Sequence, residues 1–212
     1  MEQIITQELI NKAMTYEQYR SMINELLEKG LTTGPKQNET MLNYGRLNAK
    51  RMKKWDKIAR ITPELHERLL DIKKPVTWLV LTEGWCGDAA QNLPFINKMA
   101  EINPLINLKL ILRDENLEVM DEYLTDGGRS IPKLIVLDAE NLSTLGTWGP
   151  RPAPMQKLVM DNKVTKEKNY GELNEVMHLW YAKDRGITLQ NEILAILGVW
   201  NKKQQSLPVQ AV

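Results

Sequence analysis

An apolar run that ends beside the chain's single cysteine constrains the fold more than any other feature. Residues 76–82 are mostly apolar and rich in β-forming types, as in a strand buried on both faces. The sequence continues through Trp85-Cys86-Gly87-Asp88-Ala89, and residues 87–102 have the pattern of a helix that contains Pro94. Cys86 therefore lies where a strand passes into a helix, and the free N–H groups and dipole of a helix start favour a thiolate there.

The pattern after this cysteine predicts an α/β core in the order β-α-β-α-β-β-α. The remaining predicted core elements are strands at 108–112, 134–137 and 143–148 and a short helix at about 115–124. A helix joins the first two strands, so they should be parallel, whereas the turn at 138–141 makes the last two an antiparallel hairpin. The predicted sheet is therefore mixed.

Helices are predicted on both sides of this core. A capping box of Thr15 and Gln18 starts one of them, with Gly30 as its C-cap, and Thr62-Pro63 starts another. The chain is helical again from about 153. We expect a helical N-terminal extension at 1–74, a core at 75–161 and C-terminal helices at 162–212 that pack on the core, because the joining segments are short.

Composition and charge exclude several classes of function. Lysine and arginine number 28 against 27 acids, a net charge of +1, so no global field attracts nucleic acid or an anionic membrane. One cysteine forbids an intrachain disulfide, no basic start precedes an apolar run, and no stretch approaches a membrane span, which together predict a cytoplasmic protein. His66 and His178 stand alone, so neither a metal site nor a cofactor is expected. The cations of residues 46–60 are interpreted as a solvated helix face.

Several motifs, in register, resemble the thioredoxin superfamily over about Val76 to Asp161. They are Trp85-Cys86-Gly87, Pro94 eight residues later, Arg129-Ser130-Ile131-Pro132 directly before the strand 133–137, and the glycine-containing loop 146–149. The chain is similar, more closely, to a subgroup of bacterial thioredoxin-like proteins with a helical N-terminal extension. The motifs that carry this similarity are Glu83-Gly84-Trp85-Cys86-Gly87-Asp88-Ala89, Gly127-Gly128 and Trp148-Gly149-Pro150-Arg151-Pro152. The resemblance implies a thioredoxin-like core in which Pro132 is cis and faces the sulfur of Cys86.

The departures from that pattern concern the redox cycle. Ala89 occupies the position of the resolving cysteine. Val80 stands where the family carries a buried acid, and the lysine that partners the acid is replaced near Leu110. Asp88 also opposes ionisation of Cys86. The full reducing cycle of a thioredoxin should therefore not run within this chain.

The residues around Cys86 form the predicted site. Substrate would contact Trp85, Gly87, Ile131, Pro132 and Gly149, and Ile131 could pair its backbone with an extended peptide. Arg129 and Arg151 would stabilise a thiolate or hold an anionic ligand; the alternative interpretation is that both are solvated surface arginines.

Two functional hypotheses follow. In the first, the protein is a monothiol thiol-disulfide oxidoreductase whose Cys86 forms mixed disulfides with a disulfide-bearing protein or a low-molecular-weight thiol, in cell redox homeostasis. In the second, it is a redox-inactive module that binds a peptide or protein. The first requires a Cys86 pKa well below the reference of about 8.5. The sequence leaves the oligomeric state open.

Overall fold

The computed structural model describes the backbone of residues 3–206 and the side chains of residues 3–198. The last part of the predicted C-terminal helices, residues 207–212, lies outside the described residues. The elements in chain order are α1 (Gln7–Lys12), α2 (Tyr16–Glu28), α3 (Glu39–Ile58), α4 (Pro63–Leu70), β1 (Val76–Thr82), α5 (Gly87–Ala100), β2 (Ile106–Leu112), the 3-10 turn η1 (Arg113–Glu115), α6 (Leu117–Glu122), β3 (Lys133–Asp138), β4 (Thr144–Trp148), α7 (Ala153–Thr165), α8 (Tyr170–Asp184) and α9 (Ile187–Ser206).

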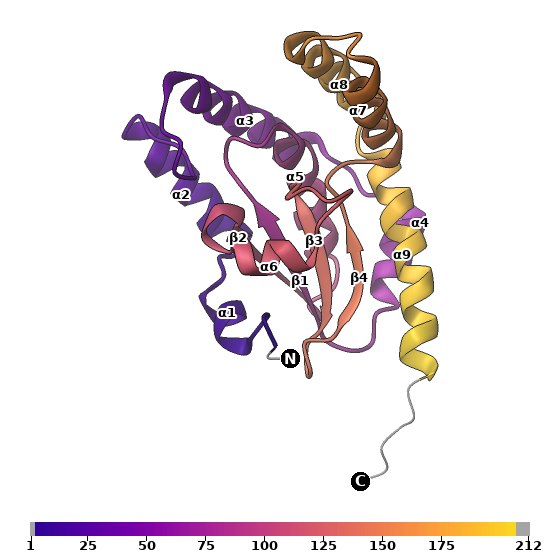
Figure 1. Ribbon diagram of the computed structural model, residues 1–212. Coiled ribbons are helices and arrows are strands. Elements are labelled where there is room, and N and C mark those ends of the chain that lie inside the picture. The colour runs from indigo at the N-terminus through magenta and orange to yellow at the C-terminus, as the bar shows by residue number, and fades with distance from the viewer. Residues whose placement is uncertain (1–2, 207–212) are drawn as a thin grey trace.

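The four strands form one mixed sheet in the order β2-β1-β3-β4. β1 and β2 are parallel, and β3 is antiparallel to both β1 and β4. The predicted β-α-β-α-β-β-α order and strand directions are confirmed. Figure 1 shows α5, which joins the parallel strands β1 and β2, and α6 on opposite faces of the sheet.

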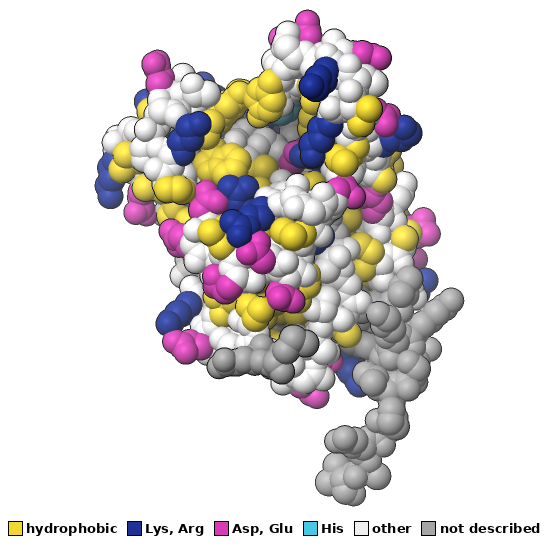
Figure 2. Space-filling model, viewed as in Figure 1, with side chains coloured by type: hydrophobic (Ala, Val, Ile, Leu, Met, Phe, Trp, Pro, Cys, Tyr) yellow, Lys and Arg dark blue, Asp and Glu magenta, His cyan; other side chains and the backbone are white. Residues whose placement is uncertain are grey.

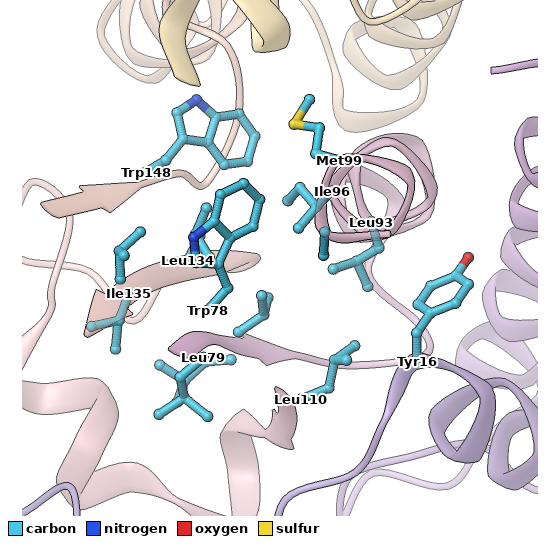
Figure 3. Close-up of a cluster of buried hydrophobic side chains, with 14 of the residues drawn as sticks. Tyr16, Trp78, Leu79, Leu93, Ile96, Met99, Leu110, Leu134, Ile135 and Trp148 are labelled. Atoms are coloured by element: carbon cyan, nitrogen blue, oxygen red, sulfur yellow. The ribbon is translucent and has the colours of Figure 1, made fainter. Parts of the chain in front are cut away.

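The core lies between α5 and the sheet. Trp78 of β1 and Leu134 of β3 point to the same side, where Leu93, Ile96 and Met99 of α5 meet them (Figure 3). All seven residues of β1 are buried, so its central position explains the nearly continuous apolar run in the sequence. At roughly 25 cal/mol per Å² of buried apolar surface, this layer is the main stabilising contribution to the core.

Both edges of the sheet are covered by the helical extensions. Met14 forms an isolated antiparallel bridge with Leu110 of β2, with N–H to O distances of 2.9 and 2.8 Å. On the other edge α9 crosses β4 so closely that a Cβ on Gly146 would lie 3.0 Å from Ile196. The helical extensions therefore contact both edge strands of the sheet.

The N-terminal and C-terminal extensions are also joined to each other. Gln190 of α9 accepts a hydrogen bond from the Thr62 N–H at 2.7 Å and donates to the Arg60 carbonyl at 3.1 Å. Thr62 is the N-cap of α4, with Pro63 in the first turn, in agreement with the sequence pattern. These bonds fix α9 against the α3–α4 junction.

The capped helices agree with the sequence, whereas several boundaries do not. Thr15 and Gln18 form the predicted capping box of α2. The predicted helix at 115–124 is instead a 3-10 turn and the six-residue α6. The C-terminal helical region is broken at Lys166, whose φ of 53° ends α7. No glycine or proline marks that break; the sequence signal that was missed is the capping box of Asn169 and Glu172, which starts α8.

Among residues 3–206, no helix combines the length and the apolar character needed to cross a membrane.

Candidate functional site

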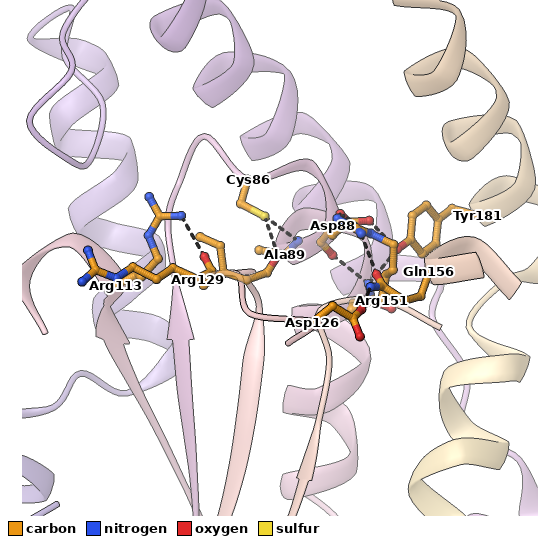
Figure 4. Close-up of polar contacts among 11 residues, drawn as sticks. Cys86, Asp88, Ala89, Arg113, Asp126, Arg129, Arg151, Gln156 and Tyr181 are labelled. Atoms are coloured by element: carbon orange, nitrogen blue, oxygen red, sulfur yellow. Dashed lines mark hydrogen bonds and ion pairs between the residues drawn. The ribbon is translucent and has the colours of Figure 1, made fainter. Parts of the chain in front are cut away.

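Cys86 is the N-cap of α5 and is nearly sealed from solvent. Its side chain is 7% exposed. Sγ accepts a hydrogen bond from the Ala89 N–H at 3.4 Å, and the thiol donates to the Ile131 carbonyl at 3.3 Å (Figure 4). Ala89 thus contacts the sulfur through its backbone, and the residue before Pro132 faces it directly. The Ile131–Pro132 peptide bond is cis.

The surroundings of the sulfur disfavour its anion. Burial raises the pKa of Cys86 to about 12, and the nearby Asp88 carboxylate adds to the rise, while the Ala89 N–H and Arg151 oppose it. A thiol donating to a carbonyl oxygen must also lose that hydrogen bond when it ionises. The structure therefore stabilises the protonated thiol.

A cleft of about 320 Å³ opens beside this thiol. Its core-side wall includes Trp85, Cys86, Gly87 and Ile131, and its other wall comes from α7 and α8. Figure 2 shows the hollow between two helical arms, which are formed by α2 and α3 on one side and by α7 and α8 on the other. Hydrophobic and cationic side chains surround it. The cleft brings together Cys86 and three of the five predicted contact residues, Trp85, Gly87 and Ile131.

The predicted residues Pro132 and Gly149 do not line this cleft. Gly149 packs against the backbone of Pro132 with a φ of +116°. A Cβ at this glycine would lie 2.2 Å from the Pro132 carbonyl oxygen. Gly149 therefore packs against the backbone of the loop before β3. Its predicted role in substrate contact stays a prediction.

The two predicted arginines line the cleft but differ in their surroundings. Arg129 is 47% exposed and pairs with Asp121 through two hydrogen bonds of 2.6 and 2.7 Å. Arg151 is largely buried and pairs with Asp88. Within the described part of the chain, neither guanidinium donates to Sγ, so their predicted action on a thiolate remains a prediction.

Asp88 joins the start of α5 to the C-terminal extension. Its Oδ2 accepts from Arg151 Nε and Nη2 at 2.9 and 2.8 Å, and its Oδ1 accepts from the Tyr181 hydroxyl at 2.6 Å (Figure 4). Arg151 also donates to Gln156, at 2.7 Å. Because each carboxylate oxygen has a partner, Asp88 positions the loop before α7 and the helix α8 around the thiol.

A buried acid that the sequence analysis did not predict directly follows the end of β1. Glu83 is fully buried; its Oε1 accepts from the Asp114 N–H at 3.0 Å, and its Oε2 has no hydrogen-bond partner among the described residues. The family pattern has its buried acid at the position of Val80, which is apolar in this chain. Nothing in the residue types distinguished Glu83 from an exposed glutamate in a turn.

We expect Glu83 to make stability depend on pH. Burial raises its pKa, so the folded state holds this proton more tightly than the unfolded state does. The stabilising contribution is complete below the unfolded pKa of about 4.5 and is lost as pH rises through the folded pKa. Glu83→Gln should flatten this part of the stability profile in urea titrations between about pH 4 and 8. Glu140→Gln, at an exposed turn position, should leave the profile unchanged; equal profiles for wild type and Glu83→Gln would contradict the prediction.

Two residues near Gly87, Arg51 and His178, have surroundings that the sequence did not predict. The run of cations around Arg51 favours a solvated basic face, yet Arg51 is half-buried and lies near Gly87. His178, which is isolated in sequence, lines the cleft. Neither position carries a motif, because both come from helices outside the core. Across residues 3–206, no three His, Cys, Asp or Glu side chains gather as metal ligands would.

The comparisons with known proteins agree with this architecture. A family model described as Thioredoxin matches residues 34–168. Among solved structures, an HIV epitope scaffold is 21% identical with a TM-score of 0.55, covering 90% of this chain and 96% of its own. A protein of unknown function from Pseudomonas aeruginosa is 21% identical with a TM-score of 0.54, covering 87% and 98%. At this identity both share the fold alone. No curated protein matches.

The family match covers more than half of the chain and includes both the Trp-Cys-Gly motif and the segment before β3. It begins inside the predicted N-terminal extension and ends within the predicted C-terminal helices, so the predicted domain boundaries stay predictions. The β-α-β-α-β-β-α core is consistent with this match. The chain belongs to the thioredoxin family.

Proposed function

We propose that this protein is a redox-inactive thioredoxin-fold module that binds a ligand in the cleft beside Cys86. The observation that carries the proposal is the state of the thiol, which is buried and donates its proton to the Ile131 carbonyl. A nucleophilic cysteine needs the thiolate, and here both burial and Asp88 oppose it. The absence of a resolving cysteine at Ala89 and of a buried acid at Val80 also argues against redox activity.

The cleft supports binding of a peptide or a small molecule. Trp85 and Ile131 offer apolar surface on one wall, and Leu173 and Met177 of α8 offer it on the other. The Ile131 N–H has no hydrogen-bond partner among the described residues. An extended peptide can pair with such a free backbone group by strand addition.

A second candidate is the monothiol oxidoreductase. The observation in its favour is that Cys86 lines the cleft and its Sγ accepts the Ala89 N–H at the start of α5. In that reaction the Cys86 thiolate would attack one sulfur of a client disulfide, the client S–S bond would break, and the other sulfur would leave as a thiolate. Since Ala89 cannot resolve the adduct, a thiol from outside the chain would release it.

Alkylation of Cys86 by iodoacetamide against pH distinguishes the two functions. The chain has one cysteine, so the label reports this thiol alone. With a pKa near 12 in place of 9.0, the native thiolate fraction at pH 8 is roughly a thousandfold smaller than in the unfolded chain, and alkylation should slow accordingly. The chain unfolded in urea is the internal reference.

The pH dependence of alkylation distinguishes the binding module from the monothiol oxidoreductase. Alkylation that is slow at pH 8 and rises only above the reference range supports the binding module, and Cys86→Ser should then fold normally. A native thiolate that titrates near or below neutrality, with alkylation as fast as in the unfolded chain, would overturn the proposal in favour of the monothiol.

A further inference from the structure

Arg51 of α3 and His178 of α8 face the same point at the start of α5. A Cβ placed on Gly87 would lie 3.9 Å from Arg51 Nη1, 3.4 Å from His178 Cε1 and 3.9 Å from His178 Nε2. Gly87 follows Cys86 directly and belongs to the cleft wall. A cation and an imidazole from the two helical arms therefore converge beside the thiol.

Arg51 is held in place without being neutralised. The Asn48 side-chain amide donates to the Gly84 carbonyl at 3.1 Å, so its Oδ1 accepts from Arg51 Nη1, at 2.9 Å. This is the one hydrogen bond that Arg51 donates within the described residues, and it forms no ion pair there. A guanidinium has five N–H donors, so most of its donors are free for a ligand.

The three arginines that line the cleft differ from Arg51 in this respect. Arg113, Arg129 and Arg151 each pair with an aspartate, at 2.6, 2.6 and 2.8 Å. Partial burial also lowers the pKa of Arg51, because the cation has lost part of its water shell without gaining a carboxylate. A half-buried cation of this kind is stabilised when an anion binds.

The hydrogen bonds behind His178 fix which ring nitrogen carries the proton. The Trp55 indole N–H can only donate, and it lies 2.6 Å from the Gln91 Oε1. The Gln91 side-chain NH₂ therefore faces His178 Nδ1, at 3.3 Å, and Nδ1 must accept. The ring proton is left on Nε2, the nitrogen beside Gly87.

His178 is neutral at physiological pH. Burial and, to a lesser extent, the Arg51 cation lower its pKa to about 4, while Asp88 acts in the opposite direction. The neutral ring therefore carries an N–H donor on Nε2, which lies 3.9 Å from the same Gly87 Cβ position that Arg51 faces. The start of α5 at Gly87 places the positive end of a 14-residue helix at the same place.

We infer that Arg51 and the Nε2–H of His178 form a binding site for an oxyanion, a carboxylate or a phosphate carried by the ligand that occupies the Cys86 cleft. The inference rests on the proposed binding function and names the charge of its ligand. The anion lies between the two side chains over Gly87 and needs no ionised cysteine. Specificity for an anionic ligand then comes from the two helical extensions and not from the thioredoxin core.

The test titrates the full chain with inorganic phosphate, sulfate and acetate at constant ionic strength. The readouts are the imidazole ¹⁵N and ¹H shifts of His178 and calorimetric binding. We expect saturable shifts centred on His178, with tighter binding of phosphate indicating a phosphorylated ligand and tighter binding of acetate a carboxylate ligand. Arg51→Met should weaken binding roughly tenfold to a hundredfold, the loss of a charged hydrogen-bond donor.

Matched variants separate the site from general charge. Arg46→Met removes an exposed cation from the same helix and should leave binding unchanged. Gly87→Ala places a methyl group in the space itself, at ordinary contact distances, and should abolish binding in a folded protein even if Arg51→Met fails to fold. Absence of saturable shifts with all three anions, or equal losses in Arg46→Met and Arg51→Met, would overturn the inference.

The experiment is independent of the thiol. Binding should persist in Cys86→Ala, so a reactive cysteine would overturn the proposed function while leaving this site intact. Conversely, a protonated thiol with no anion binding would reject this site and leave the binding module standing.

Discussion

Replacing Gly149 with alanine should destabilise the protein by about 3 kcal/mol or more. The φ of +116° is a region that residues with a Cβ rarely adopt, and the new Cβ would lie 2.2 Å from the Pro132 carbonyl oxygen and 3.4 Å from Lys133 Cα. Both neighbours are backbone, so no side chain can rotate out of the way. Urea unfolding at pH 7 measures the loss, which corresponds to roughly 10 °C in Tm for a chain of this size.

Gly30→Ala is the matched control for this substitution. Gly30 also has a positive φ, of 71°, but nothing lies within 4 Å of an added Cβ. It should cost only the conformational strain, about 1 kcal/mol. Equal losses for Gly30→Ala and Gly149→Ala would show that the contact with Pro132 contributes nothing.

The same pair of glycines shows what sequence reasoning can and cannot supply. The place of Gly30 after an amphipathic run predicts a helix C-cap from local information, and the structure puts the C-cap one residue earlier, at Lys29. A motif places Gly149 near the site and so predicts substrate contact. Its actual contact is with a carbonyl seventeen residues earlier in the chain, and no local pattern carries that distance.

The core was predictable because its signals are periodic and local. β1 is buried throughout and has the sequence of an apolar run, and the 138–141 turn indicates the antiparallel hairpin of β3 and β4. The capping box of α2 depends on two residues three apart. Each of these features is set by neighbours in sequence, so one chain sufficed to find it.

The site was predictable only in part because its chemistry depends on distant segments. The pattern locates Cys86 correctly at a helix start, which alone favours a thiolate. The family resemblance placed the segment before β3 at the sulfur, but the burial that reverses the thiolate preference was not predicted. Arg51 and His178 carry no signal for the same reason, since they lie on helices at opposite ends of the chain.

Replacing Asp88 with alanine should cost about 3–5 kcal/mol, because breaking one half of a buried ion pair has this magnitude. The mutation leaves the largely buried Arg151 cation and the Tyr181 hydroxyl without their carboxylate partner. It should also lower the pKa of Cys86, because a negative charge near the sulfur is removed. Urea unfolding measures the first effect and the pH dependence of alkylation the second.

Asp88→Asn separates the charge from the hydrogen bonds. The amide oxygen can still accept one bond, so the loss of stability should be smaller than in Asp88→Ala, while the pKa of Cys86 should fall in both variants. An unchanged pKa in both would mean that burial alone protects the thiol and that the Asp88 charge has no effect on the sulfur.

A double substitution tests whether the ion pair stabilises the fold or mainly fixes its arrangement. If the penalty in Asp88→Ala arises from the uncompensated Arg151, then Asp88→Leu combined with Arg151→Met should recover most of the lost stability, because an apolar pair needs no counter-charge. The Asp88 carboxylate also accepts from Tyr181 of α8, and that bond is not restored. A stable double variant that still binds anions would therefore show that neither the Arg151 cation nor the bond from Tyr181 to Asp88 is needed to hold His178 over the start of α5.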